Sequence, residues 1–137
     1  MKRILIMGLP GAGKTTLAKK LSYSLNAEWL NADNIRKKNN DWDFSFAGRE
    51  RQAKRMLGLA QKFNNAGKCV VADFVCPLPN LREKFDPDFL IWMDTIKKGR
   101  YEDTNQMFVP PENYNVRVSE KDAEKWSLKI LKILNAK

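Results

Sequence analysis

Four residues near the start of the chain have the spacing of a loop that holds a polyphosphate. The pattern is G-x-x-x-x-G-K-[ST], filled by Gly8, Gly13, Lys14 and Thr15. Glycines let the backbone curl and turn its N–H groups inward. The lysine then reaches the terminal phosphates, and the threonine hydroxyl can bind Mg²⁺. We therefore expect a nucleoside triphosphate, with magnesium, to bind a set of loop residues: Gly8, Gly11, Ala12, Gly13, Lys14, Thr15 and Thr16.

Charged side chains that could act on the terminal phosphate come later in the chain. Asp33 and Arg36 lie in the polar run "NADNIR". There an aspartate can accept the proton of an attacking hydroxyl, and an arginine can hold the acceptor. Asp73 follows the apolar run "CVVA" and is suited to share Mg²⁺ with Thr15, often through water. Arg49, near the start of a long amphipathic segment, is expected to contact the substrate.

The elements that must position these side chains alternate along the chain. Short apolar runs predict strands over residues 3–7, 27–32, 68–74, 88–94 and 114–118. Apolar residues at three- and four-residue steps predict helices over 14–26, 44–67 and 119–134, the last with Ser119 as its N-cap. This alternation predicts an α/β fold with a parallel sheet and helices on both faces. Ligands of such sheets bind beyond the carboxyl ends of the strands, where the polar residues named above are found.

Composition narrows the class of protein. The 137 residues are expected to form a single domain over 1–137. No apolar run is long enough to span a membrane, no signal-peptide pattern is present, and two cysteines suggest a reducing cytoplasm. With no histidine, acid–base chemistry falls to carboxylates, Lys, Tyr or Cys. The sequence does not decide the oligomeric state, and a homodimer is one of the alternatives.

The net charge of +9 has more than one explanation. A basic chain can bind nucleic acid, or it can bind two small polyanions at once. The lysines are scattered in pairs rather than gathered in one block, and lysine and asparagine are abundant throughout. We therefore favour compositional bias together with small anionic ligands over a nucleic-acid surface.

The chain resembles the adenylylsulfate kinase family of P-loop kinases, which phosphorylate the 3′-hydroxyl of adenylylsulfate. The resemblance is carried by "GLPGAGKTTLA", by "LNADNIR", by an ungapped run over residues 44–83 and by "FVPPENYNVRV". It implies a P-loop kinase fold with a five-stranded parallel sheet in the order 2-3-1-4-5. It also implies phosphoryl transfer from ATP to a hydroxyl, with adenylylsulfate as the leading acceptor.

The resemblance further implies roles for particular side chains. Asp33 would be the carboxylate near the acceptor hydroxyl and would act with Lys14, and Arg100 is the best remaining candidate for a lid arginine. Arg36 and Arg49 would contact the phosphosulfate. The full set implied to bind the substrate is Asp33, Arg36, Phe44, Arg49, Gln52, Phe74 and Val75, in which Phe44 would stack on the adenine and the last two contribute backbone.

The sequence also departs from the family's pattern. Asn31 replaces an aspartate, Gln52 replaces an asparagine, and Asp73 and Cys76 stand where the family has serine. Only "TIKKGRYEDTNQM" joins the fourth strand to Phe108, where the family carries a longer lid. Lids supply arginines and exclude water, so this shortening leaves closure and the acceptor open.

Two other functions therefore compete. The run "NADNIRKK", an aspartate after the third strand and the positive charge also resemble 5′-hydroxyl polynucleotide kinases. A nucleotide-binding protein without transfer activity is the third hypothesis, although the retained Lys14, Thr15, Asp33 and Asp73 argue against it.

Overall fold

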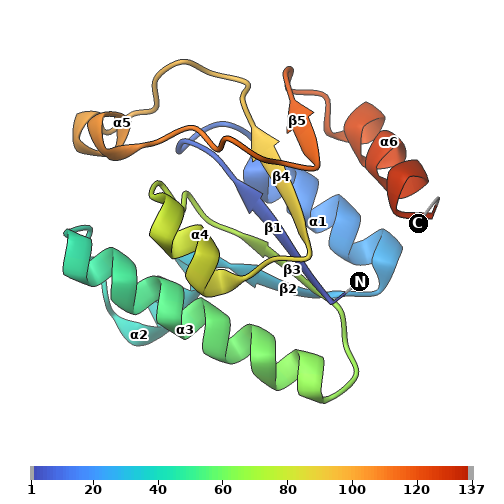
Figure 1. The fold of residues 1–137 in the computed structure, drawn as a ribbon, viewed down its shortest axis with the longest axis horizontal. Helices are drawn as coiled ribbons and strands as arrows, with labels where there is room; N and C mark the ends of the chain where they lie inside the picture. The colour runs from blue at the N-terminus through green and yellow to red at the C-terminus, as the bar shows by residue number, and fades with distance from the viewer. Residues whose placement is uncertain (1, 136–137) are drawn as a thin grey trace.

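The computed structural model describes residues 2–135 and is built on one parallel sheet with the strand order β2-β3-β1-β4-β5 (Figure 1). The strands are β1 (Arg3–Met7), β2 (Glu28–Asn31), β3 (Val70–Asp73), β4 (Phe89–Met93) and β5 (Val116–Val118). The predicted sheet order is confirmed, and each strand lies within its predicted range. The carboxyl ends of all five strands consequently meet at one edge of the sheet.

Six helices are found in the described part of the chain. They are α1 (Lys14–Leu25), α2 (Ala32–Asn39), α3 (Phe46–Asn65), α4 (Pro79–Phe85), α5 (Glu102–Met107) and α6 (Ala123–Asn135). The predicted helices correspond to α1, α3 and α6. The other three are short, so they carry too few turns for an apolar stripe to be recognised. Within residues 2–135, no helix has the length and apolar character that crossing a membrane requires.

The predicted start of the last helix is wrong. α6 begins at Ala123, and the carboxylate of Asp122 accepts a hydrogen bond from Lys125 N at 3.2 Å, so Asp122 rather than Ser119 caps it. Two isoleucines of this helix differ in burial. Ile130 is fully buried, whereas Ile133 is 39% exposed.

The side chains of β1 alternate between the two faces of the sheet, as the two-residue period of a strand requires. Ile4 and Ile6 pack with residues of α1 and α6, while Leu5 and Met7 pack with residues of α3 and α4. Figure 1 shows these helix pairs on opposite faces. Both faces of the central strand are therefore buried, which fixes the loop that follows Met7 to a rigid support.

Candidate active site

The P-loop (residues 8–15), which joins β1 to the first turn of α1, has the conformation that its glycines predict. Gly11 and Gly13 have φ values of +89° and +97°, in a region that side chains disfavour. At Gly8 an added Cβ would lie 2.7 Å from the backbone oxygen of Met93, so only glycine fits there. The loop therefore combines left-handed turns with close packing on β4.

Lys14 lies within the loop with its side chain largely buried. Its Nζ donates a hydrogen bond to the backbone oxygen of Leu9 at 2.9 Å. Burial lowers the pKa of Lys14 to about 8, an effect that the charges of Asp73 and Asp33 oppose and that of Arg100 reinforces. The ammonium group is thus held by one carbonyl, in a place where phosphate oxygens would stabilise its charge better.

Asp73 ends β3 and contacts three side chains, two from β2 and one from the P-loop. Its Oδ2 accepts a hydrogen bond from Trp29 Nε1 at 2.6 Å, and Asn31 Nδ2 donates to both carboxylate oxygens. The hydroxyl of Thr15 lies 3.4 Å from Oδ1. Burial raises the pKa of Asp73, and the hydrogen bonds from Trp29 and Asn31 act in the opposite direction. A cation beside this carboxylate would offset the cost of burying its charge.

The oxygens of Thr15 and Asp73 suit Mg²⁺, which prefers hard oxygen ligands. Over residues 2–135, no group of three or more His, Cys, Asp or Glu side chains gathers as a metal site. A magnesium ion here would complete its shell with nucleotide phosphates and water, as Mg²⁺ commonly does. The residues present therefore fit a magnesium–nucleotide complex rather than a metal held by protein alone.

Helix α2 places the predicted acceptor-side residues Asp33 and Arg36. It begins after Asn31, whose Oδ1 accepts a hydrogen bond from Asn34 N at 3.0 Å and so caps the helix. Asp33 is exposed in the first turn, and its charge acts on the pKa of Lys14. Arg36 follows one turn later and is buried. The helix, which was not predicted, thereby directs a carboxylate toward the P-loop.

Arg36 and Arg49 meet at the ring of Phe44. The Cζ atoms of the two arginines lie 4.3 and 5.4 Å from the ring centroid. Arg36 Nη1 donates to the backbone oxygens of Asp41 and Asp43, and Arg49 Nε donates to the backbone oxygen of Phe44. The loop that carries Phe44 is therefore held by the same guanidinium groups that are predicted to bind the substrate anion.

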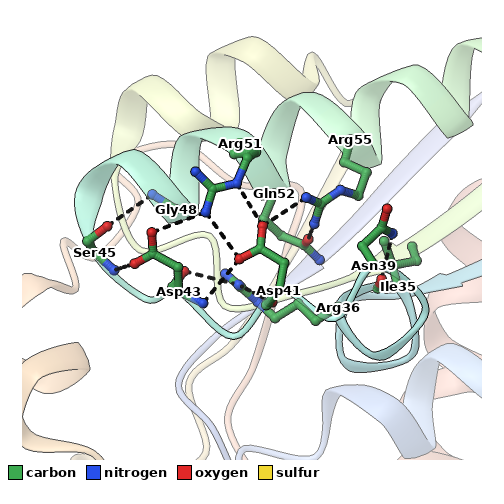
Figure 2. A network of polar contacts seen from close by, with 10 residues as sticks. All are labelled: Ile35, Arg36, Asn39, Asp41, Asp43, Ser45, Gly48, Arg51, Gln52 and Arg55. Atoms are coloured by element: carbon green, nitrogen blue, oxygen red, sulfur yellow. Dashed lines mark hydrogen bonds and ion pairs between the residues drawn. The ribbon is translucent and has the colours of Figure 1, made fainter.

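An ion-pair network that the sequence analysis missed holds this loop to α3 (Figure 2). The carboxylate of Asp41 accepts hydrogen bonds from Arg51 Nε at 2.7 Å and from Arg55 Nη2 at 2.8 Å. Arg51 also pairs with Asp43 at 3.1 Å. An added Cβ at Gly48 would lie 2.1 Å from the backbone oxygen of Asp43, so glycine is required where the loop lies on the helix.

Gln52 joins α3 to α2 through its side-chain amide. Its Nε2 donates to the backbone oxygen of Ala32 at 3.1 Å, and its Oε1 accepts from Arg55 Nη1 at 2.6 Å. Figure 2 shows it beside Arg55 at the edge of the Asp41 network. The network therefore reaches the helix that carries Asp33.

The short connection after β4 lies against α3. Arg49 Nη2 donates to Thr104 Oγ1 of α5 at 2.8 Å, in a buried position. Asn105 closes the segment by accepting from Gly99 N at 2.7 Å and donating to Gly99 O at 3.2 Å. Arg100 lines the cavity here. The connection is thus held by hydrogen bonds within itself and to α3, and Figure 1 shows it beyond the carboxyl ends of the strands.

One cavity of about 1300 Å³ joins the P-loop to the Phe44 cluster. All the predicted site residues line it except Gly8, which packs on β4, and Ala12, which is buried. Sequence reasoning missed several lining residues, because single aromatic or polar residues in loops, at the start of a helix or in a helix as short as α5 give no periodic signal. They include Trp42, Phe46, Tyr101, Thr104 and Met107.

The sequence of this chain matches a family model and the sequences of curated proteins. A family model described as adenylylsulphate kinase matches residues 2–88. The adenylyl-sulfate kinase of Prochlorococcus marinus is 40% identical over 83 residues, which cover 56% of this chain and 41% of that protein. The chain thus spans about two fifths of the length of that curated relative.

Solved structures share the fold at low sequence identity. A Mycobacterium tuberculosis APS kinase in complex with AMPPNP and APS superposes with a TM-score of 0.79 at 19% identity, over 98% of each chain. A shikimate kinase from Acinetobacter baumannii in complex with shikimate gives 0.65 at 19% identity, over 99% of this chain and 94% of the other. This fold therefore serves acceptors of different chemistry.

Proposed function

The chain belongs to the adenylylsulphate kinase family, and from that premise we propose that it transfers the γ-phosphate of ATP to the 3′-hydroxyl of adenylylsulfate. The observation that carries the proposal is the single cavity shared by the P-loop and the cluster of Arg36, Phe44 and Arg49. A kinase needs its donor and acceptor in one enclosed space, because in-line transfer requires their reacting atoms to meet.

On the donor side, the backbone of the P-loop surrounds the β- and γ-phosphates. Lys14 exchanges the backbone oxygen of Leu9 for phosphate oxygens and offsets the charge that develops during transfer. Thr15 and Asp73 would hold Mg²⁺, which when bound neutralises the phosphates. Arg100 adds a second positive charge near Lys14.

On the acceptor side, Asp33 accepts the proton of the attacking hydroxyl. Its place in the first turn of α2 and its electrostatic effect on Lys14 support this role. Arg36 and Arg49 have guanidinium nitrogens beyond those bound to the loop, which suit the oxygens of a phosphosulfate. The ring of Phe44 is half exposed and offers a surface for the adenine.

The remaining proposals concern the chain as a whole. We propose one domain over residues 1–137, because both hydrophobic clusters share the central sheet. Two free cysteines support a reducing compartment such as the cytoplasm.

Ligand-induced stabilisation tests the acceptor assignment. Adenylylsulfate, added at micromolar concentration to the complex with AMPPNP, is expected to raise the melting temperature, because a ligand of the folded state stabilises it. Arg49→Ala should weaken this increase while leaving the effect of AMPPNP alone nearly unchanged. A 5′-hydroxyl oligonucleotide should raise the melting temperature only by an amount that falls steeply as the salt concentration increases. A salt-resistant shift with the oligonucleotide and none with adenylylsulfate would contradict the proposal.

A further inference from the structure

Asn31 and Asp73 are the last residues of two neighbouring parallel strands. β2 and β3 pair with these residues in register, so they lie side by side at the carboxyl edge of the sheet. Thr15 Oγ1 is 3.3 Å from Asn31 Nδ2 and 3.4 Å from Asp73 Oδ1. The P-loop hydroxyl is therefore equally close to both side chains.

The amide of Asn31 has a different partner at each end. Its Oδ1 accepts from Asn34 N and caps α2, while its Nδ2 donates to the carboxylate of Asp73 at 3.1 and 3.2 Å. An aspartate would serve equally as the cap. The contact between positions 31 and 73 needs one donor and one acceptor that face each other. Either β2 or β3 could supply the donor.

Trp29 completes the pattern from the same strand as Asn31. Its Nε1 donates to Asp73 Oδ2 at 2.6 Å. If position 73 carried an amide and position 31 a carboxylate, the amide oxygen could accept from Trp29 and the amide nitrogen could donate to the carboxylate. Exchanging the two side chains therefore leaves each of these donors with an acceptor, and it keeps one negative charge beside Thr15.

We propose that positions 31 and 73 form one carboxylate–amide pair, whose carboxylate can face magnesium from either strand. Asn31 is then a positioning residue that couples the cap of α2 to the orientation of Asp73. This inference deepens the proposed function and rests on it.

Calorimetric titration of the full chain with AMPPNP, with and without Mg²⁺, tests the pair without relying on turnover. Mg²⁺ should strengthen AMPPNP binding by a certain factor in the wild type. In Asp73→Asn this factor should be about 10–100-fold smaller, the usual effect of removing a metal's outer ligand. The exchanged variant Asn31→Asp/Asp73→Asn should recover most of that loss. Asp94→Asn is the matched control, because Asp94 follows β4 and pairs with Arg117 at 2.8 Å; it should behave as the wild type.

A second variant leaves the charges unchanged. Trp29→Phe removes only the donor to Oδ2, so it should reduce the effect of Mg²⁺ by on the order of tenfold while AMPPNP binding without Mg²⁺ stays constant. If the exchanged protein does not fold, this variant still tests whether Asp73 is positioned by its neighbours.

The outcomes separate the inference from the proposed function. If wild-type binding of AMPPNP does not respond to Mg²⁺, the proposed function is wrong. If the wild type responds, but a folded exchanged variant is as impaired as Asp73→Asn, the pair is not interchangeable and the inference fails. An unchanged response in Trp29→Phe would likewise overturn the positioning of Asp73 by its neighbours.

Discussion

Arg49 Nη2 donates to Thr104 Oγ1 at 2.8 Å, and this buried bond joins α3 to α5 across 55 residues of sequence. The same guanidinium donates to the backbone oxygen of Phe44. Arg49 thus connects the loop that presents Phe44 to α5, in the short connection after β4. Movement of α5 and binding at Phe44 should consequently be coupled.

Thr104→Val tests this coupling. Valine has nearly the same shape but cannot accept the hydrogen bond, so a buried charged donor loses its partner, at a cost of about 1–3 kcal/mol in the free energy of unfolding. Hydrogen exchange should accelerate in residues 101–107 more than in β3. Thr104→Ser keeps the acceptor and is expected to behave as the wild type. Equal exchange rates for α5 in the valine variant and the wild type would refute the connection.

Lys14 should take up a proton when the nucleotide binds. Its pKa is about 8 in the free protein, because burial disfavours the charged form. Phosphate oxygens favour that form, so binding raises the pKa, and at about pH 9 a proton must enter with the ligand. Calorimetry in two buffers of different ionisation enthalpy measures the uptake. Lys14→Arg stays charged and should show none; a binding heat independent of buffer in the wild type would contradict the assignment.

Asp33→Asn and Asp73→Asn should fail in different ways. Loss of the proton acceptor at Asp33 should lower kcat by about 10²–10⁴-fold and leave ATP affinity largely intact. Loss of the carboxylate at Asp73 weakens the magnesium shell, so raising Mg²⁺ should relieve part of its defect. Steady-state kinetics at several Mg²⁺ concentrations compares them. If raising the Mg²⁺ concentration restores the activity of both variants equally, the two carboxylates do not have the separate roles proposed here.

Asp41 should make the fold sensitive to acid. Hydrogen bonds from Arg51 and then Arg55 hold the pKa of Asp41 well below its usual range. The carboxylate therefore stabilises the fold above its unfolded pKa of about 3.9, and the stabilisation is lost as the pH falls toward the lower folded value. Urea midpoints should drop less between neutral and acid pH in Asp41→Asn than in the wild type. Glu50→Gln, which removes an exposed pair with Lys84, is the control and should not flatten the profile.

The P-loop and two of the predicted carboxylates could be placed from strand ends alone. The P-loop, Asp33 and Asp73 come directly after apolar runs, and parallel strands bring such ends together. The motif at residues 8–15 also fixes its own backbone, since few residues other than glycine fit those positions. Local pattern was enough here because the supporting elements are long and buried.

The network around Asp41 could not be predicted in this way. Its partners Arg51 and Arg55 lie ten and fourteen residues away, on a helix whose charged face looks like an ordinary solvated surface. Asn31 was noted only as a departure from a pattern, because its contact with Asp73 depends on strand register. The misplaced cap of α6 has a local cause: Ser119 and Asp122 are both good caps, and sequence does not choose between them.

Transfer of labelled γ-phosphate from ATP to adenylylsulfate tests the central claim most directly. The wild type, with Mg²⁺, should place the label on the 3′-hydroxyl, and Lys14→Ala should reduce the rate by on the order of 10²-fold or more with the fold intact. Adenosine 5′-phosphates without the sulfate and a 5′-hydroxyl oligonucleotide serve as competing acceptors. Label on the oligonucleotide, or label only in free phosphate, would contradict the account.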